Sequence, residues 1–494
     1  MTGRDLYLLS PELAMVGLAL AVVVLDLVVK RRGVLPLVSV VGLLVPFVLA
    51  GFLWGTLHAQ DRMQMVGLYD TLVVDRLALF FKFLVLGSVA LVFMASTDYV
   101  DKKVPHRGEF YALVLLSATG MMLLAATREL ISIYVSLELT ALPLAALAAF
   151  LGDSRSSEAG MKFLVLSAIS SALLLYGMAL VYGFTGTTYL ADIAQAVARS
   201  ASDGPPFGSY ALLMGGILIV AGFGFKIASV PFQMWVPDVY QGAPTPVTAF
   251  LSVASKAAGF AILLRVFYVA FPSVSADWDV LFAGLAAASM TVGNLVAVTQ
   301  RDIKRMLGYS TIAHAGYLLV GVAAVSARAG GGDVSGPGGV LFYLAAYAAT
   351  NLTAFFAIIA ISSATGSDRI EDFSGMGQRA PWLAALLALA MVSLIGIPPT
   401  ALFMGKLYLF TAAVKSGLLW LAVVGVVNSV LSAYYYLRVV RVMYLGKPAA
   451  KEPVPASLPF KLAVGVSGLG ILALGVAPGP LLDAVQTAVR VVLP

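Results

Sequence analysis

Five ionisable side chains lie deep inside long apolar segments of this chain: Glu138, Lys226, Lys256, His314 and Lys406. A charge near the centre of a bilayer is costly, so such residues usually face protein or water and mark an ion path. Burial pushes a lysine toward its neutral form, and a nearby carboxylate pushes it back toward its charged form. Residues of mixed sign can therefore load and release protons, and we predict that these five form a proton relay.

Each of these residues also has a structural explanation. Glu138 could simply hydrogen-bond to the neighbouring hydroxyl of Ser136 or Thr140. A lone buried histidine is more often a satisfied core residue, and a lysine side chain can reach the interface instead of staying buried. The depth of Lys226, and the position of His314 five spans after Glu138, favour the relay.

Other charges in the apolar segments carry weaker signals. Lys162 lies near the cytoplasmic start of its segment, and it fits a secondary relay site as well as a side chain that reaches the interface. Lys82 is the other secondary candidate, or else the partner of a neighbouring subunit. Arg265 is expected to reach the outer interface, and Asp26 needs no special role.

The composition requires a membrane protein. Of the 494 residues, 60% are hydrophobic and 11% are charged, with a mean hydropathy of +0.95, whereas soluble domains are about 25% charged. A membrane-spanning helix needs about 20 apolar residues, which leaves room for about fourteen spans in the lipid bilayer and no soluble domain. No cleavable signal is expected, because Lys30, Arg31 and Arg32 follow the first apolar stretch.

The chain contains no cysteine. Iron–sulfur clusters are held mainly by thiolates, so we expect no cluster, no disulfide, and no other cofactor or metal bound by this chain. The formal charge of +6 is better explained by Lys and Arg in cytoplasmic loops than by nucleic-acid binding. Any redox chemistry is therefore expected in other subunits.

The apolar segments predict an all-α polytopic fold. The expected spans are residues 10–29, 34–56, 75–96, 110–127, 129–151, 158–184, 209–240, 245–271, 277–299, 303–326, 339–363, 381–414, 418–444 and 458–477. Lys and Arg in alternate connections number about 17 on one side against about 8 on the other. By the positive-inside rule the richer side is cytoplasmic, which places both termini outside the cytoplasm.

Two expected spans are too long and are interrupted by proline. The seventh, residues 209–240, contains Pro231, and the twelfth, residues 381–414, contains Pro398-Pro399. Proline removes a backbone donor and clashes with the preceding turn. Because the breaks lie five spans apart, they predict an inverted repeat of spans four to eight against nine to thirteen. Two ordinary proline kinks are the alternative.

This repeat divides the chain into four parts. They are an N-terminal three-span segment (1–108), a first antiporter-like repeat (109–271), a second antiporter-like repeat (272–445), and a connector with the C-terminal span (446–494).

The charged strings at the two breaks resemble the antiporter-like membrane subunits of respiratory complex I, the type I NADH:quinone oxidoreductase. The resemblance covers nearly the whole chain and is densest from Lys226 to Arg265. It rests on Phe225-Lys226 followed by Pro231 through Val247, and on Pro398-Pro399-Thr400 with Phe403-Met404-Gly405-Lys406. Among the branches L, M and N, the chain is most similar to subunit N, because Lys406 stands where branch M is expected to carry glutamate and the lateral helix of branch L is missing.

The resemblance implies a role for each candidate. Glu138 and Lys226 would form a charge-coupled pair, Lys256 and His314 would continue the polar axis, and Lys406 would face the outlet. One departure is position 241, where the family more often has glutamate and this chain has glutamine. A carboxylate is thereby lost from the cytoplasmic side of the path.

The resemblance also implies a setting. NADH, FMN, iron–sulfur clusters and quinone would belong to partner subunits, and an M-like subunit and small membrane subunits would be the neighbours. The location would be the bacterial inner (plasma) membrane. The expected function is proton translocation coupled to quinone reduction elsewhere in the complex. The alternatives are a subunit of a multi-subunit cation/proton antiporter, a hydrogenase-linked proton pump, and a structural spacer whose charges only pair internally.

Overall fold

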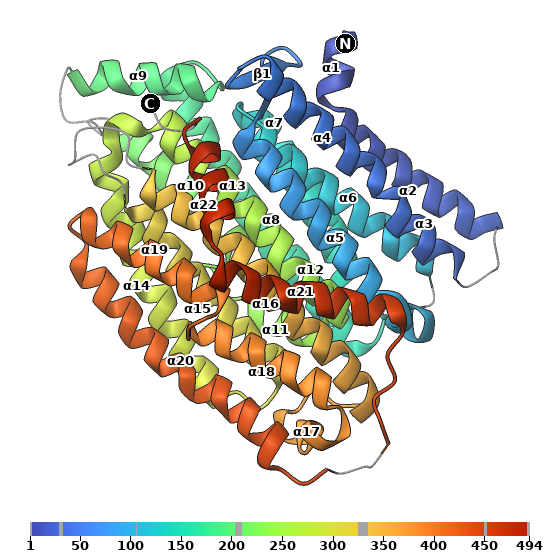
Figure 1. The fold of residues 1–494 in the computed structure, drawn as a ribbon. Helices are drawn as coiled ribbons and strands as arrows, with labels where there is room; N and C mark the ends of the chain where they lie inside the picture. Colours follow the sequence, from blue (N-terminus) through green and yellow to red (C-terminus); the bar gives the residue numbers. More distant parts are fainter. Residues whose placement is uncertain are drawn as a thin grey trace.

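The computed structural model describes residues 2–28, 33–104, 106–202, 210–324, 334–448 and 452–491. Among them, thirteen helices are long and apolar enough to cross a membrane, and Pro381–Ile395 is a shorter apolar helix. Counted together, these give the fourteen crossing elements that the sequence predicts. The long helices run side by side as one bundle (Figure 1), so the prediction of an all-α polytopic membrane fold is confirmed.

The helices begin and end close to the expected positions. Those of the first half are α1 (Gly3–Leu8), α2 (Ser10–Val28), α3 (Val34–Gly42), α4 (Leu44–Ala59), α5 (Arg76–Lys103), α6 (Arg107–Ala126), α7 (Leu130–Ala148), α8 (Ser154–Thr185), α9 (Leu190–Ser202), α10 (Tyr210–Ile227), α11 (Val236–Gly242), α12 (Thr245–Phe250) and α13 (Lys256–Ala270). Those of the second half are α14 (Ser275–Thr299), α15 (Ile303–Ala323), α16 (Ser335–Thr365), α17 (Met376–Arg379), α18 (Pro381–Ile395), α19 (Ala401–Lys415), α20 (Leu419–Leu445), α21 (Leu458–Val476) and α22 (Gly479–Val489).

Acidic residues cap several of the spanning helices. The side chains of Asp75, Asp153 and Asp302 each accept a hydrogen bond from a backbone N–H in the first turn of α5, α8 and α15. The first N–H groups of a helix have no partner inside it, so a capping carboxylate satisfies them. These caps fix where each helix enters the bundle.

Several small elements among the described residues lie outside the predicted spans, including the short helices α1 and α17. A two-stranded antiparallel sheet joins α4 to α5, with β1 (Gln64–Gly67) paired to β2 (Leu72–Asp75) so that Met65 faces Val74. The helices α9 and α22 do not span the bundle. They lie at the same end of it as α1 and β1, whereas α17 lies at the opposite end (Figure 1).

Both predicted breaks are present. After α10 the backbone turns at Ala228, whose φ is +66°, and the indole nitrogen of Trp235 donates to the carbonyl of Phe225 at 3.0 Å. After α18 it turns at Gly396, whose φ is +89°. Positive φ favours glycine, and the second break uses it, whereas the first places an alanine there. The seventh and twelfth crossings are therefore each two helices joined by unwound chain.

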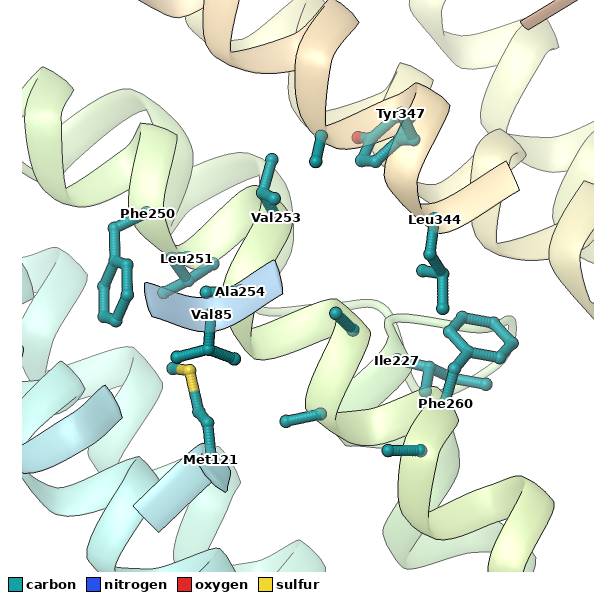
Figure 2. Close-up of a cluster of buried hydrophobic side chains, with 14 of the residues drawn as sticks. Val85, Met121, Ile227, Phe250, Leu251, Val253, Ala254, Phe260, Leu344 and Tyr347 are labelled. Atoms are coloured by element: carbon teal, nitrogen blue, oxygen red, sulfur yellow. The ribbon is translucent and has the colours of Figure 1, made fainter. Parts of the chain in front are cut away.

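The eighth crossing is the most deeply buried element. It consists of α12, a π-helical segment η1 (Leu251–Ser255), and α13, and its most apolar 18-residue window is entirely buried. Apolar side chains from α5, α6, α10 and α16 meet around it, including Val85, Met121, Ile227 and Leu344 (Figure 2). A π segment shifts the register of the residues that follow, here directly before Lys256.

Some of the loop cations used to predict the orientation lie outside the described residues. These are Lys30, Arg31, Arg32, Arg328 and Lys451.

Candidate functional site

Glu138 and Lys226 occupy adjacent parts of the bundle without forming an ion pair. Lys226 is 5% exposed at the end of α10, and the charge of Glu138 on α7 acts on it. Within the described residues, neither Oε1 of Glu138 nor Nζ of Lys226 has a hydrogen-bond partner. Thr140, which the sequence offered as a partner of Glu138, donates to the carbonyl of Ser136 instead. The pair is therefore open in this structure.

The end of α10 packs tightly on α13, one turn after Lys256. A methyl group added to Gly259 would lie 3.3 Å from Cγ of Lys226 and 2.8 Å from Cγ2 of Ile227. Only a glycine leaves room for this approach. The packing of the seventh crossing on the eighth thus places Lys226 one helical turn along α13 from Lys256.

Lys256 is buried where α13 begins. Its Nζ donates to the carbonyl of Thr311 on α15 at 2.5 Å and lies 5.4 Å from the ring centre of Tyr347 on α16. The hydroxyls of Thr311 and Tyr347 are 2.8 Å apart. Lys256 is therefore joined by direct contacts to the two helices that carry the next group of the relay.

His314 lies at the centre of a cluster of tyrosines. Its Nδ1 is 2.7 Å from the hydroxyl of Tyr343 on α16, and its Nε2 is 3.3 Å from the hydroxyl of Tyr436 on α20. The side chain is 1% exposed. An imidazole with a hydroxyl at each nitrogen can accept a proton on one side and release it on the other.

Lys406 sits against the second break. Its Nζ donates to the carbonyls of Leu394 at 3.2 Å and Ile395 at 2.8 Å, and to the hydroxyl of Ser429 at 3.0 Å. The last carbonyls of a helix lack partners within it and carry partial negative charge. The unwound end of α18 therefore stabilises a charged Lys406 in a site that is otherwise buried.

The family model described as "NADH:quinone oxidoreductase/Mrp antiporter, TM" matches residues 127–432, a stretch that contains all five relay candidates. The chain belongs to this family.

Curated relatives extend the match to nearly the full length. The chain is 44% identical over 492 residues to a protein named NADH-quinone oxidoreductase subunit N from Dehalococcoides mccartyi, covering 98% of this chain and 99% of that one. A protein of the same name from Moorella thermoacetica is 44% identical over 497 residues, covering 99% and 100%. These relatives are named for subunit N, the branch of the family that the sequence predicts.

Solved structures share the fold. A chain of respiratory complex I from Thermus thermophilus with bound aureothin has a TM-score of 0.80 and 33% identity, covering 97% of this chain and all of that one. A chain of the Mrp complex from a Dietzia species has a TM-score of 0.84 at 23% identity, covering 99% and 97%, which is a likeness of fold alone.

Lys82 and Lys162, the two secondary candidates, each form ion pairs with carboxylates of the same chain. Nζ of Lys82 lies 2.8 Å from the carboxylate of Glu12 on α2. Nζ of Lys162 lies 2.7 Å from Glu158 and 2.6 Å from Asp238. These ion pairs join the two lysines to carboxylates outside the five relay candidates. The pairs can therefore hold helices together without taking part in the relay.

Arg265 lies at the end of the bundle that holds the β1–β2 hairpin, and it is buried, with 4% of the residue exposed. Its guanidinium makes a two-pronged ion pair with Asp75, at 2.9 and 3.0 Å, and also donates to the carbonyl of Ala125. Arginine suits such a fork better than lysine. The side chain joins the end of α13 to the start of α5.

A polar cavity of about 510 Å³ opens at the end of the bundle where α5, α8, α11, α15 and α16 have their loops. Charged side chains line it, including Lys103, Asp153, Arg155, Arg301, Asp302, Lys304, Asp368 and Arg369.

In the part of the chain that the structure describes, no group of three or more His, Cys, Asp or Glu could hold a metal ion.

The hydroxyl groups around the relay were not among the site residues predicted from the sequence. Ser310 and Thr311 precede His314 by four and three residues, and Tyr317 follows it by three. Residues at these spacings share a face of a helix, so the pattern on α15 was a usable signal. Tyr343 and Tyr436 had no such signal, because they come from other helices.

Proposed function

We propose that this chain is the N-type membrane subunit of a proton-translocating NADH:quinone oxidoreductase, without redox chemistry of its own. The relatives bear that name, and the chain has no cysteine to hold an iron–sulfur cluster. NADH, FMN, iron–sulfur clusters and quinone belong to partner subunits in this proposal. An M-like subunit and small membrane subunits are the neighbours, in the bacterial plasma membrane.

One observation carries the proposal: a buried series of polar contacts links Lys256 to His314 and surrounds Lys406. Lys256 meets Thr311 and Tyr347, and His314 lies 5.1 Å from the ring of Tyr347. Burying polar groups in a bilayer protein is costly unless they are paired or have a function. A structural spacer needs no such series across its interior.

Glu138 and Lys226 begin the proposed cycle. When Glu138 approaches Lys226, its charge stabilises the ammonium group, and when it withdraws, the lysine releases its proton toward Lys256. At an effective dielectric constant near 20, opening such a pair from about 4 to about 8 Å changes the interaction by about 2 kcal/mol. The open pair in this structure corresponds to the releasing state.

Lys256, His314 and Lys406 complete the cycle. The proton passes from Lys256 to the imidazole and then to Lys406, whose bonds to the carbonyls of Leu394 and Ile395 stabilise the charged form. Residues 109–271 and 272–445 act as the two repeats, with 1–108 and 446–494 as flanking parts. Uptake is from the cytoplasm and release is to the side that holds both termini.

Substitution of Lys226 and Lys406 by alanine in the assembled complex tests the proposal. We expect NADH:quinone turnover and proton uptake into inverted vesicles to fall together by about tenfold or more, with assembly intact on native gels. Lys415→Ala is the matched control, since Lys415 is an exposed lysine on the same helix as Lys406. Wild-type turnover and an unchanged proton-to-electron ratio in both relay variants would leave the spacer interpretation standing.

A further inference from the structure

The relay proposed above has a gap between His314 and Lys406. Within the described residues, His314 contacts the hydroxyls of Tyr343 and Tyr436, whereas Lys406 contacts Ser429 and two carbonyls. No hydrogen bond joins the two groups directly. A proton that leaves the imidazole therefore needs further hydroxyls to reach the lysine.

Tyr436 begins a chain of hydroxyls on one side of this gap. Its hydroxyl bonds to that of Ser310 and interacts with that of Tyr435, and the two tyrosine rings lie 4.3 Å apart. The hydroxyl of Tyr435 donates to Oδ1 of Asn294 on α14 at 2.9 Å. This chain leads from the imidazole of His314 to a buried amide.

The same amide meets the groups around Lys406. Asn294 also interacts with the hydroxyl of Tyr317, to which Ser429 donates at 3.2 Å. Nζ of Lys406 bonds to Ser429 at 3.0 Å and lies 4.4 Å from the ring centre of Tyr317. Asn294 therefore accepts a bond from the last hydroxyl on the His314 side and interacts electrostatically with the first on the Lys406 side.

A second asparagine fixes the orientation of this amide. Nδ2 of Asn294 donates to Oδ1 of Asn428 at 3.1 Å and to its carbonyl at 3.3 Å. Asn428 in turn donates to Thr291 at 3.3 Å and to the carbonyl of Val424 at 3.0 Å. With the nitrogen bound on the α20 backbone side, Oδ1 is left to face Tyr435. Fully bonded buried networks of this kind hold their members in place.

We propose that Asn294 is a positioning residue for the second half of the relay, and that Tyr436, Tyr435, Tyr317 and Ser429 conduct the proton from His314 to Lys406. The inference rests on the proposed function, because it assumes that protons move along this axis. Asn294 is 0% exposed and Asn428 is 3% exposed, so the pair lies wholly inside the protein. Its polar atoms have no solvent to interact with.

The proton balance is simple. The imidazolium of His314 gives its Nε2 proton to the oxygen of Tyr436, which releases its own hydroxyl proton to Tyr435. A water molecule between the hydroxyls of Tyr435 and Tyr317 takes the proton released by Tyr435 and gives one of its own to Tyr317, while the amide of Asn294 keeps its protons. The oxygen of Ser429 then takes a proton from Tyr317 and releases its own to the neutral amine of Lys406. One proton leaves and one arrives, and every hydroxyl ends neutral.

A competing path runs through Tyr343. This tyrosine bonds to Nδ1 of His314, and a methyl group on Gly405 would lie 2.8 Å from its ring, next to Lys406 in the chain. The two paths predict different sensitive residues, because Tyr343 forms no hydrogen bond to Asn294 or Tyr435 within the described residues. Single substitutions can therefore separate them.

The test uses four variants in the assembled complex: Tyr435→Phe, Asn294→Leu, Tyr343→Phe and the control Tyr434→Phe. Tyr435→Phe removes one oxygen and keeps the ring packed on Tyr436, so it leaves the fold intact even if Asn294→Leu fails to assemble. Tyr434 precedes Tyr435 on α20 and is 64% exposed. Native gels report assembly, and turnover and vesicle acidification are measured in H2O and D2O.

We expect Tyr435→Phe and Asn294→Leu to lower pumping and turnover together by about tenfold, to raise the solvent isotope effect, and to be non-additive when combined. A packing defect would not change the isotope effect. Wild-type behaviour of Tyr435→Phe, or a loss confined to Tyr343→Phe, overturns the inference. Lys226→Ala in the same preparation distinguishes failure of this inference from failure of the proposed function. If Lys226→Ala also leaves turnover and pumping at wild-type values, the proposed function itself is wrong.

Discussion

Gln241 shows how a single neutral side chain holds together a group of charges at one end of the bundle. Its Nε2 donates to Asp302 at 3.1 Å, and its Oε1 accepts from Arg305 at 3.1 Å. Arg305 also contacts Asp238 at 2.6 Å. An amide can satisfy an anion and a cation at once, whereas a carboxylate can satisfy only the cation. The glutamine thus has a role that the glutamate expected at this position could not fill beside Asp302.

The substitution Gln241→Glu is expected to make stability depend more strongly on pH. Burial raises the pKa of the Asp302 carboxyl above its ordinary value; the N–H of Arg305 opposes that rise, and the charge of Asp368 adds to it. A second carboxylate would raise the pKa of the pair further. A carboxyl with a raised pKa in the folded state contributes stability at low pH that is lost as the pH rises through that pKa.

The midpoint of thermal unfolding of the purified complex checks this. We expect the deficit of Gln241→Glu relative to the native chain to be smaller at about pH 4, near the ordinary pKa of a carboxyl, than at pH 8. Gln241→Met is the control, because it removes the same hydrogen bonds without adding a charge, and its deficit is expected to change less between the two pH values. If the deficit of Gln241→Glu is the same at both pH values, the prediction is wrong, and Arg305 and Lys304 fully compensate the added charge.

At the scale of elements, the second break depends on one glycine that touches the relay. Gly396 has φ +89°, and a methyl group there would lie 3.0 Å from Cδ and 3.5 Å from Nζ of Lys406. Left-handed backbone costs a residue with a Cβ roughly 1 to 2 kcal/mol. Backbone conformation and lysine position are therefore set by the same residue.

Gly396→Ala is expected to displace Lys406 from the carbonyls of Leu394 and Ile395 and to lower coupled turnover several-fold, while the complex still assembles. Gly284→Ala is the matched control, because nothing lies within 4 Å of a methyl group at that glycine and alanine is favoured over glycine inside a helix. Turnover and proton uptake of both variants in inverted vesicles give the answer. Native activity in Gly396→Ala would show that the lysine tolerates a shifted position.

The same scale shows what the sequence can predict. Hydropathy and proline placed all fourteen crossings and both breaks, because each span must bury its own backbone bonds in lipid. Hydropathy did not predict α9. Its apolar residues Leu190, Ile193 and Val197 are buried, but the segment is too short and too polar to be read as a membrane span. At the site, depth alone identified the charged residues, whereas partners such as Tyr436 and Asn294 depend on which helices pack together. The ion pair of Arg265 could not be predicted for the same reason, since its partner Asp75 lies 190 residues away.

At the scale of the whole molecule, an even number of crossings puts the first and last helices at one end of the bundle. α1, α22, the β1–β2 hairpin and α9 share that end, and α17 lies at the other (Figure 1). The loops richer in Lys and Arg belong to the α17 end by their sequence positions, among them those with Arg301 and Arg379. By the positive-inside rule, we propose that the α17 end faces the cytoplasm.

The lack of cysteine makes this orientation directly measurable. A single introduced cysteine is the only thiol in the chain, so a membrane-impermeant maleimide reports its side without further changes. Tyr69, in the hairpin, is 87% exposed, and the side chain of His106, before α6, is 72% exposed. We expect Tyr69→Cys to be labelled in right-side-out vesicles and His106→Cys in inverted ones, each by at least about tenfold over the opposite preparation. The reverse pattern would invert the direction of the relay, because Lys406 and both breaks would then release protons toward the cytoplasm.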